Sequence, residues 1–185
     1  MRDIYTRTGD DGTTGLLFGG RVRKDDPAVA ACGDVDEAQA AIGMARAVAG
    51  GAAAAAELDH LLVALERDLW VLMAELATAP ENRSKLVAGR TLVTAEMVSA
   101  LEPIIDDVTG RFPPPREFVL PGQTPVAAAL DVARTVVRRA ERAALTAAPP
   151  ESLAVPYLNR LSDLLWALAR WQEGESLPSR PASQE

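Results

Sequence analysis

A polar, glycine-rich segment near the start of the chain carries residue types that bind phosphate. Residues 6–16 read TRTGDDGTTGL and hold four threonines, three glycines and two aspartates. Glycine lets the backbone adopt positive φ and approach a ligand closely, and successive N–H groups in such a loop form an anion-binding concavity. The segment lacks the Gly-Lys-Ser/Thr ending of a Walker A loop. We therefore expect a phosphate-binding loop of another kind, completed by residues further along the chain.

A second set of charged residues repeats at helical spacing in the segment RTVVRRAER. Arg134, Arg138, Glu141 and Arg142 lie at i, i+4, i+7 and i+8 and so share one face of a helix. Such a face could bind an anionic ligand. It could equally be a solvent-exposed surface with i,i+4 ion pairs, which is the more common use of this pattern.

Two further helix starts carry polar side chains. Asn159, Ser162 and Asp163 share a face at i, i+3 and i+4, which suits either a ligand or a polar-sided helix start. In GDVDEAQ, the acidic residues are expected in the first turn of a helix, where they favour the helix dipole; they are Asp34, Asp36 and Glu37.

The chain offers no evident protein nucleophile and no transition-metal site. His60 is its only histidine and Cys32 its only cysteine, too few for a zinc ligand set. Cys32 is expected to be a small buried residue rather than an activated thiol, because no histidine is close in sequence. Neither G-x-S-x-G nor H-E-x-x-H occurs.

Composition narrows the class of protein. The 185 residues, 48% hydrophobic and 24% charged, predict one soluble domain. A net charge of −7 argues against a general nucleic-acid or membrane-surface binder. A single cysteine and the polar start of the chain predict a cytoplasmic protein. The longest apolar run, 52–76, contains too many charged residues to span a membrane.

Hydrophobic periodicity and helix-ending residues predict the elements that position these groups. Leucines recur at i, i+3 and i+4 between residues 58 and 76, and prolines separate several such segments. No segment is predicted as a strand. One domain is expected over 1–175, with a disordered tail at 176–185. The expected helices cover about 34–48, 57–77, 94–108, 124–146 and 156–172.

Several of these segments, taken in order, resemble one enzyme family. TRTGDDGTTGL, FVLPG at 118–122, RTVVRRAER and YLNRLSDLLWALAR are similar to motifs of the PduO-type ATP:cob(I)alamin adenosyltransferases. The resemblance runs from Ile4 to Arg170. It implies an all-α, five-helix up-and-down bundle of ferritin-like type, assembled as a homotrimer with active sites between subunits. It also implies that the cobalt of a reduced corrinoid attacks the 5′ carbon of ATP and expels triphosphate, which explains the missing protein nucleophile.

The resemblance assigns roles around ATP. Lys24 and Arg138 match cations that face the triphosphate, and Asn159 matches an asparagine that reaches ATP. Glu141 matches an acidic residue near the nucleotide and its Mg²⁺, which is held mainly by the phosphates. The loop residues expected to wrap the phosphates are Thr6, Arg7, Thr8, Gly9, Gly12 and Thr13.

The resemblance also assigns corrinoid contacts to Phe118 and Asp163. Phe118 matches an aromatic residue under the corrin ring that keeps the lower axial ligand off cobalt. A plainer alternative is that Phe118 plugs the core beneath its proline-flanked loop. Asp36 and Arg134 match an ion pair that crosses the subunit boundary. Together with Arg138, Phe118, Asp36 and Arg134 form the predicted catalytic group.

Alternatives remain open at this stage. A trimeric carrier or sensor could bind ATP or adenosylcobalamin without turnover, and a plain structural bundle would leave residues 6–16 without a purpose. The chain departs from the family pattern at Ala38, Gln39 and Gln123, which concerns corrinoid affinity more than reaction class. The expected partners are ATP, a corrinoid, a reductase and an enzyme that accepts adenosylcobalamin, with no nucleic acid and no membrane.

Overall fold

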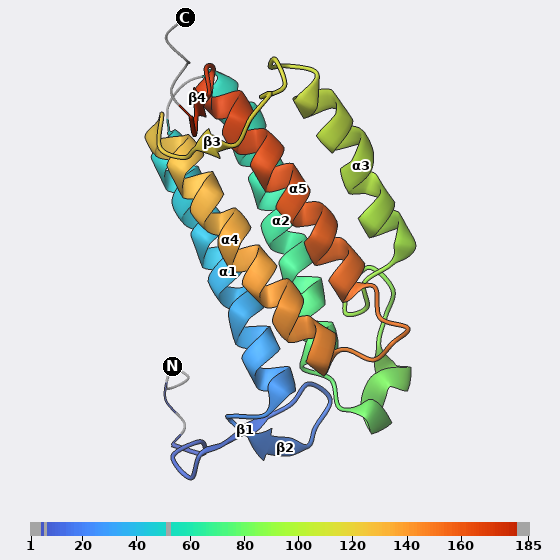
Figure 1. Cartoon of the computed structure of the whole chain (residues 1–185). Helices are drawn as coiled ribbons and strands as arrows, with labels where there is room; N and C mark the ends of the chain where they lie inside the picture. The colour runs from blue at the N-terminus through green and yellow to red at the C-terminus, as the bar shows by residue number, and fades with distance from the viewer. Residues whose placement is uncertain (1–4, 6, 51–52, 181–185) are drawn as a thin grey trace, which may run out of the picture.

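The computed structural model describes residues 5, 7–50 and 53–180. Five long helices run alternately up and down in one bundle (Figure 1). Helix α1 packs against α2 and α4, and α5 packs against α4 and α3. The predicted all-α bundle is confirmed. The helices are α1 (Pro27–Ala49), α2 (Ala53–Leu76), α3 (Ala95–Thr109), α4 (Pro125–Ala147) and α5 (Ala154–Glu173).

Helix α4 shows how local sequence sets an element that later carries site residues. The Thr124 hydroxyl accepts a hydrogen bond from the backbone N–H of Ala127, and Pro125 occupies the first turn, as expected for a capped start. Its buried side consists mostly of alanine, leucine and valine. The alanines let α1 and α4 approach closely. This packing fixes which way the charged side of α4 faces.

The predicted start of α1 was wrong. The helix begins at Pro27, and the Asp26 carboxylate caps it by accepting a hydrogen bond from the Ala28 N–H. The acidic residues of GDVDEAQ therefore lie beyond the first turn and do not interact with the helix N-terminus. Asp34 and Glu37 instead form ion pairs with Arg139 of α4. The predicted starts of α2 and α5 were late as well.

The expectation of no strands was also wrong. β1 (Thr13–Gly15) pairs antiparallel with β2 (Arg21–Arg23), and β3 (Val119–Leu120) pairs with β4 (Leu177–Pro178). The tail predicted from 176 is thereby corrected: residues 176–180 are ordered against the α3–α4 connection, and 181–185 lie outside the described residues. One domain over 1–175 stays a prediction.

A buried carboxylate joins two connections at the end of the bundle near the β1–β2 hairpin. Glu75, 1% exposed, accepts hydrogen bonds from the Arg83 guanidinium at 3.0 Å and the Val93 N–H at 2.8 Å. It also accepts one from the Ser152 hydroxyl at 2.6 Å. Arg83 belongs to the 3₁₀ helix η1 (Pro80–Lys85). Because two of these donors belong to the α2–α3 connection and the third to the α4–α5 connection, Glu75 holds the two connections together.

A second buried polar contact joins α2 to α5 and gives a stability prediction. The fully buried Tyr157 donates a hydrogen bond to Asp68 Oδ2 at 2.8 Å. Burial raises the pKa of the Asp68 carboxyl, and the Tyr157 hydrogen bond opposes that shift. Tyr157→Phe leaves this carboxylate without its donor, so we expect a loss of about 1–3 kcal/mol in unfolding free energy at neutral pH.

The pH dependence of that loss follows from the direction of the shift. A carboxyl whose folded pKa is raised above its ordinary value adds stability when protonated, and the contribution is lost as pH rises through the folded pKa. Urea unfolding should therefore show a smaller deficit for Tyr157→Phe at about pH 4 than at pH 7. Tyr5→Phe, at an exposed position, is the matched control. An equal deficit at both pH values would contradict this account.

Candidate functional site

The phosphate-loop segment is organised by its own side chains. The Asp11 carboxylate accepts hydrogen bonds from the Thr13 N–H at 2.9 Å and the Thr13 hydroxyl at 2.7 Å. The hydroxyl bond is the main cause that lowers the pKa of Asp11. Arg21 of β2 donates to the Thr13 hydroxyl at 2.6 Å and to the Thr8 carbonyl oxygen at 2.5 Å. The hairpin thus sets the shape of the loop.

Lys24 lies against this loop. Its Nζ would be 3.2 Å from a Cβ added at Gly9, and its backbone N–H donates to the Gly12 carbonyl oxygen at 2.9 Å. Gly12 has φ of +81°, which suits glycine. The Arg7 guanidinium lies over the Tyr5 ring, 5.3 Å from its centroid. The structure therefore brings the predicted loop residues and Lys24 together, while Thr6 lies outside the described residues.

A second group forms where α4 faces α5. Asn159 donates to Glu141 Oε1 at 3.1 Å, and Arg138 Nη1 lies 3.9 Å from Glu141 Oε2. Asn159 Oδ1 in turn accepts a hydrogen bond from Arg160 at 3.2 Å. The structure thus gathers three predicted ATP ligands from two helices. Asp163 is exposed one turn further along α5.

Phe118 is 89% exposed, so the structure rules out the alternative that it plugs the core. Its carbonyl oxygen accepts a hydrogen bond from the Ser179 N–H at 2.7 Å, directly beside the β3–β4 pairing. The ring borders a cavity of about 360 Å³ that Arg134 and Trp166 also line. The Phe118 side chain therefore lies at the edge of a cavity that the Arg134 side chain also lines.

The two residues expected to pair across subunits are in different places within one chain. Asp36 is exposed and lines a cavity of about 320 Å³ between β1, α1 and α2, with Thr14 and Trp70. Arg134 lines the Phe118 cavity and forms an ion pair with Asp131 of its own helix at 3.0 Å. The Asp36–Arg134 pair stays a prediction.

Cys32 lines the same cavity as Asp36, and none of the predicted chemistry falls on the cysteine or the histidine. Burial raises the pKa of the Cys32 thiol, with Asp36 adding a smaller effect, which makes the thiol less reactive. His60 is exposed on α2. Within residues 5, 7–50 and 53–180, no cluster of three or more His, Cys, Asp or Glu side chains has a metal-binding arrangement. Among the described helices, none has the length and apolar character needed to cross a membrane.

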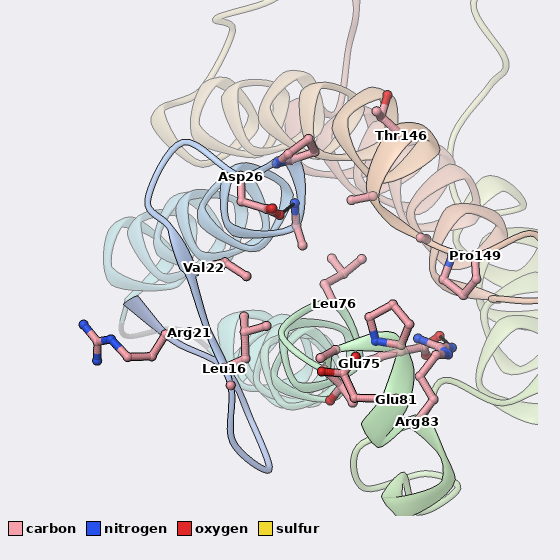
Figure 2. A pocket seen from close by; sticks show the side chains of 18 residues that line it. Leu16, Arg21, Val22, Asp26, Glu75, Leu76, Glu81, Arg83, Thr146 and Pro149 are labelled. Carbon is pink, nitrogen blue, oxygen red and sulfur yellow. Dashed lines mark hydrogen bonds and ion pairs between the residues drawn. The ribbon is translucent and has the colours of Figure 1, made fainter. Parts of the chain in front are cut away.

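A cavity of about 520 Å³ lies at the hairpin end of the bundle, between β2, α1, α2 and the end of α4 (Figure 2). It contains none of the predicted site residues. Figure 2 shows the Arg21 guanidinium pointing away from its centre, and Glu75 and Arg83 are already paired with each other. We assign no chemistry to this cavity.

Sequence reasoning missed two kinds of residue at these sites. Arg21 shapes the phosphate loop, and its position shortly after the glycine-rich segment was the available signal. Asp131 and Arg170 line the Phe118 cavity and are bonded to each other at 2.5 Å. Charged residues on the otherwise apolar sides of α4 and α5 were the signal that could have identified them.

Comparison with known proteins gives a consistent result. Residues 4–172 match the family model described as cobalamin adenosyltransferase. The chain is 44% identical over 172 residues to the corrinoid adenosyltransferase of Mycobacterium bovis, covering 90% of this chain and 86% of that one. It is 41% identical over 178 residues to the corrinoid adenosyltransferase PduO of Salmonella typhimurium, covering 94% of this chain and 50% of that one. The chain thus spans about half the length of PduO.

A solved structure is similar over nearly the whole chain. It is a Phe-to-Ala variant of the PduO-type ATP:corrinoid adenosyltransferase from Lactobacillus reuteri, complexed with cobalamin and ATP. The TM-score is 0.84 at 30% identity, and the match covers 97% of this chain and 100% of that one. An Arg-to-Lys variant of the same enzyme, complexed with ATP, matches with a TM-score of 0.83.

Proposed function

The chain belongs to the cobalamin adenosyltransferase family, and from that membership we propose that it transfers the 5′-deoxyadenosyl group of ATP to a reduced corrinoid. The observation that carries the proposal is Phe118, an aromatic side chain 89% exposed at the rim of the cavity that holds Arg134. Exposed aromatic rings on ordered loops seek apolar cover, and the face of a corrin ring provides it.

The substrates supply the reacting groups. The cobalt(I) of the corrinoid attacks C5′ of ATP, the Co–C5′ bond forms, and the C5′–O5′ bond breaks with its electron pair leaving on triphosphate. The protein orients C5′ toward cobalt and stabilises the charge that gathers on the leaving group. Lys24 and the loop N–H groups bind the phosphates from one side, and the Arg138 guanidinium binds them from the other.

Glu141 fits a magnesium ion that arrives with ATP. Its carboxylate is partly buried, with one oxygen bonded to Asn159 and the other near Arg138. A single carboxylate suits Mg²⁺, which keeps waters and phosphate oxygens as its other ligands. When bound, the ion neutralises phosphate charge. Asn159 then orients the Glu141 carboxylate.

Phe118 acts on the corrinoid. We propose that its ring packs against the lower corrin face and keeps the axial base off cobalt, with Asp163 binding the periphery. Four-coordinate cobalt(II) accepts an electron more easily, because the electron enters an orbital that no axial donor raises. The proposal includes a cytoplasmic location, because the reaction consumes ATP, and a reductase and an adenosylcobalamin acceptor as partners.

The active site is proposed to lie between two chains of a homotrimer. Asp36 lies beside β1, and Lys24 contacts the loop before β1, whereas Arg134 and Phe118 line a separate cavity. Arg138 lies one turn after Arg134 on α4. In the proposed trimer, Asp36 of one chain reaches Arg134 of its neighbour and closes the gap between the two regions. A heterologous contact of this kind forms a closed ring in a cyclic trimer.

The oligomeric state is a direct prediction of this arrangement. Light scattering coupled to size exclusion should give three times the chain mass of 19.6 kDa. Neutral substitutions of Asp36 should lower this mass at dilute protein concentration, because they remove the proposed ion pair that Arg134 forms with the neighbouring chain. A monomer with full activity would contradict the shared site.

Turnover separates the enzyme from a carrier. With ATP, reductant and cobalamin under anaerobic conditions, we expect the visible spectrum of adenosylcobalamin to appear. Exposure to light should abolish this spectrum, because adenosylcobalamin is light-sensitive. A carrier would bind ATP or adenosylcobalamin without this spectral change. The same assay with several corrinoids tests whether Ala38, Gln39 and Gln123 alter substrate preference.

A further inference from the structure

A buried series of polar contacts connects the β3–β4 pair beside Phe118 to Arg134, and no role assigned so far accounts for it. At its centre is Arg170 of α5, 2% exposed. Its Nη2 donates to Asp131 Oδ2 at 2.5 Å and to Glu173 Oε1 at 2.7 Å. We call this series the ion-pair chain; its members are Arg134, Asp131, Arg170, Glu173 and Ser176.

Each end of the ion-pair chain reaches a predicted site element. At one end, Asp131 Oδ1 accepts a hydrogen bond from Arg134 Nε at 3.0 Å. At the other end, Ser176 Oγ donates to Glu173 Oε2 at 2.8 Å. Ser176 directly precedes β4, which pairs with β3 immediately after Phe118. The same contacts therefore orient Arg134 and hold the β3–β4 pair that presents Phe118.

Stability alone does not explain the ion-pair chain, because burying charged side chains carries a large desolvation free energy. The side chain of Glu173 is fully buried, and Arg170 Nε is buried with no hydrogen-bond partner in the part of the chain that the structure describes. Desolvation of buried ions offsets much of their attraction, so apolar residues often stabilise such a position as well or better. The charged side chains instead provide geometric specificity, because the hydrogen bonds of a guanidinium fix the orientation of the carboxylates that it contacts.

We propose that Arg170 is a positioning residue, which couples the placement of Phe118 under the corrinoid to the orientation of Arg134 at the subunit boundary. This inference rests on the proposed function and adds to it a link between the corrinoid side of the site and the subunit boundary at Arg134. Arg170 lines the Phe118 cavity, and its guanidinium lies 5.8 Å from the centroid of the Trp166 ring. It acts through its neighbours rather than on the reacting atoms.

The test compares Arg170→Gln with a matched arginine that also bridges two carboxylates. Arg46 contacts Asp59 at 3.0 Å and Glu66 at 2.8 Å between α1 and α2, and none of the three lines the Phe118 cavity. Both variants lose a bridging guanidinium, so both are expected to be less stable. Assays are run on the trimeric protein well below each melting temperature.

We expect Arg170→Gln to lower kcat by about tenfold to a hundredfold, the scale of a small misplacement of reacting groups. The KM for ATP should change less than twofold by the same reasoning, because Lys24 and Arg138 are untouched. The four-coordinate cob(II)alamin signal in the ATP complex should weaken, and Arg170→Lys should restore part of it. Arg46→Gln should keep both the signal and kcat.

Ser176→Ala gives a second reading that does not depend on a buried charge. Loss of this hydroxyl frees only the β4 end of the ion-pair chain, so the KM for the corrinoid should rise while the Arg134 end stays intact. The inference is overturned if the parent enzyme is active and Arg170→Gln, folded and trimeric, behaves as Arg46→Gln does. If the parent makes no adenosylcobalamin, the proposed function fails instead.

Discussion

Replacement of Phe118 by alanine should abolish most turnover while leaving the protein folded. The ring is 89% exposed and makes little contribution to the core, so the unfolding free energy should change by no more than about 0.5 kcal/mol. Turnover that requires reduction of cob(II)alamin on the enzyme should fall by about a hundredfold. The loss should be smaller when cob(I)alamin is supplied already reduced, because the ring acts before the adenosyl transfer itself.

Spectroscopy identifies the cause of this loss. The parent complex of cob(II)alamin with ATP should show a four-coordinate signal, and the Phe118→Ala complex a five-coordinate one. Leu120→Ala is the matched control, since it trims an exposed apolar side chain on β3, next to Phe118, that does not line the Phe118 cavity. A four-coordinate signal in Phe118→Ala would assign the exclusion of the base to another residue.

Replacement of Arg138 by alanine should impair the use of ATP. A lost charge-assisted contact to phosphate costs about 1.5–3 kcal/mol, which lowers kcat/KM for ATP by roughly ten- to a hundredfold. Arg138 is half exposed and lies 3.9 Å from Glu141, so its removal should leave the circular dichroism spectrum unchanged. Arg138→Lys should recover part of the activity, since it keeps the charge and loses the planar fork.

Arg142→Ala is the matched control for Arg138. It removes an exposed arginine one turn further along α4 and should leave the ATP dependence unchanged. If Arg138→Ala is fully active, or if both variants lose activity equally, the charged face of α4 is a solvent surface as its spacing alone would allow.

The helices could be predicted from the sequence because local signals agree with packing. Thr124 and Pro125 mark the start of α4, and leucines at i, i+3 and i+4 define the buried side of α2. The strands could not, since two or three residues are too few for a period of two to be visible. The start of α1 was missed because the glycine and acidic residues near Asp34 resemble a helix start, whereas the effective cap is Asp26.

The predicted site residues likewise fall into those placed by local sequence and those placed by contacts between distant segments. Motifs within one segment, such as the loop with Lys24, lie together because a short hairpin joins them. Asp131 and Arg170 were not predicted because their importance depends on a contact between α4 and α5. A single charged residue on the apolar side of one helix does not reveal which residue of another helix it contacts. Any contact between Asp36 and Arg134 depends on a neighbouring chain, so one chain cannot display it.

The central claim is that adenosyl transfer occurs at sites built from two chains, and subunit complementation tests it most directly. Lys24→Ala removes the loop-side cation and Arg138→Ala removes the helix-side cation, so each homotrimer should be nearly inactive. In trimers formed from an equal mixture, about a quarter of the sites combine an intact loop with an intact neighbouring helix. We predict that adenosylcobalamin formation returns to about that fraction of the parent rate. Mixed trimers that stay as inactive as the two homotrimers would contradict the account.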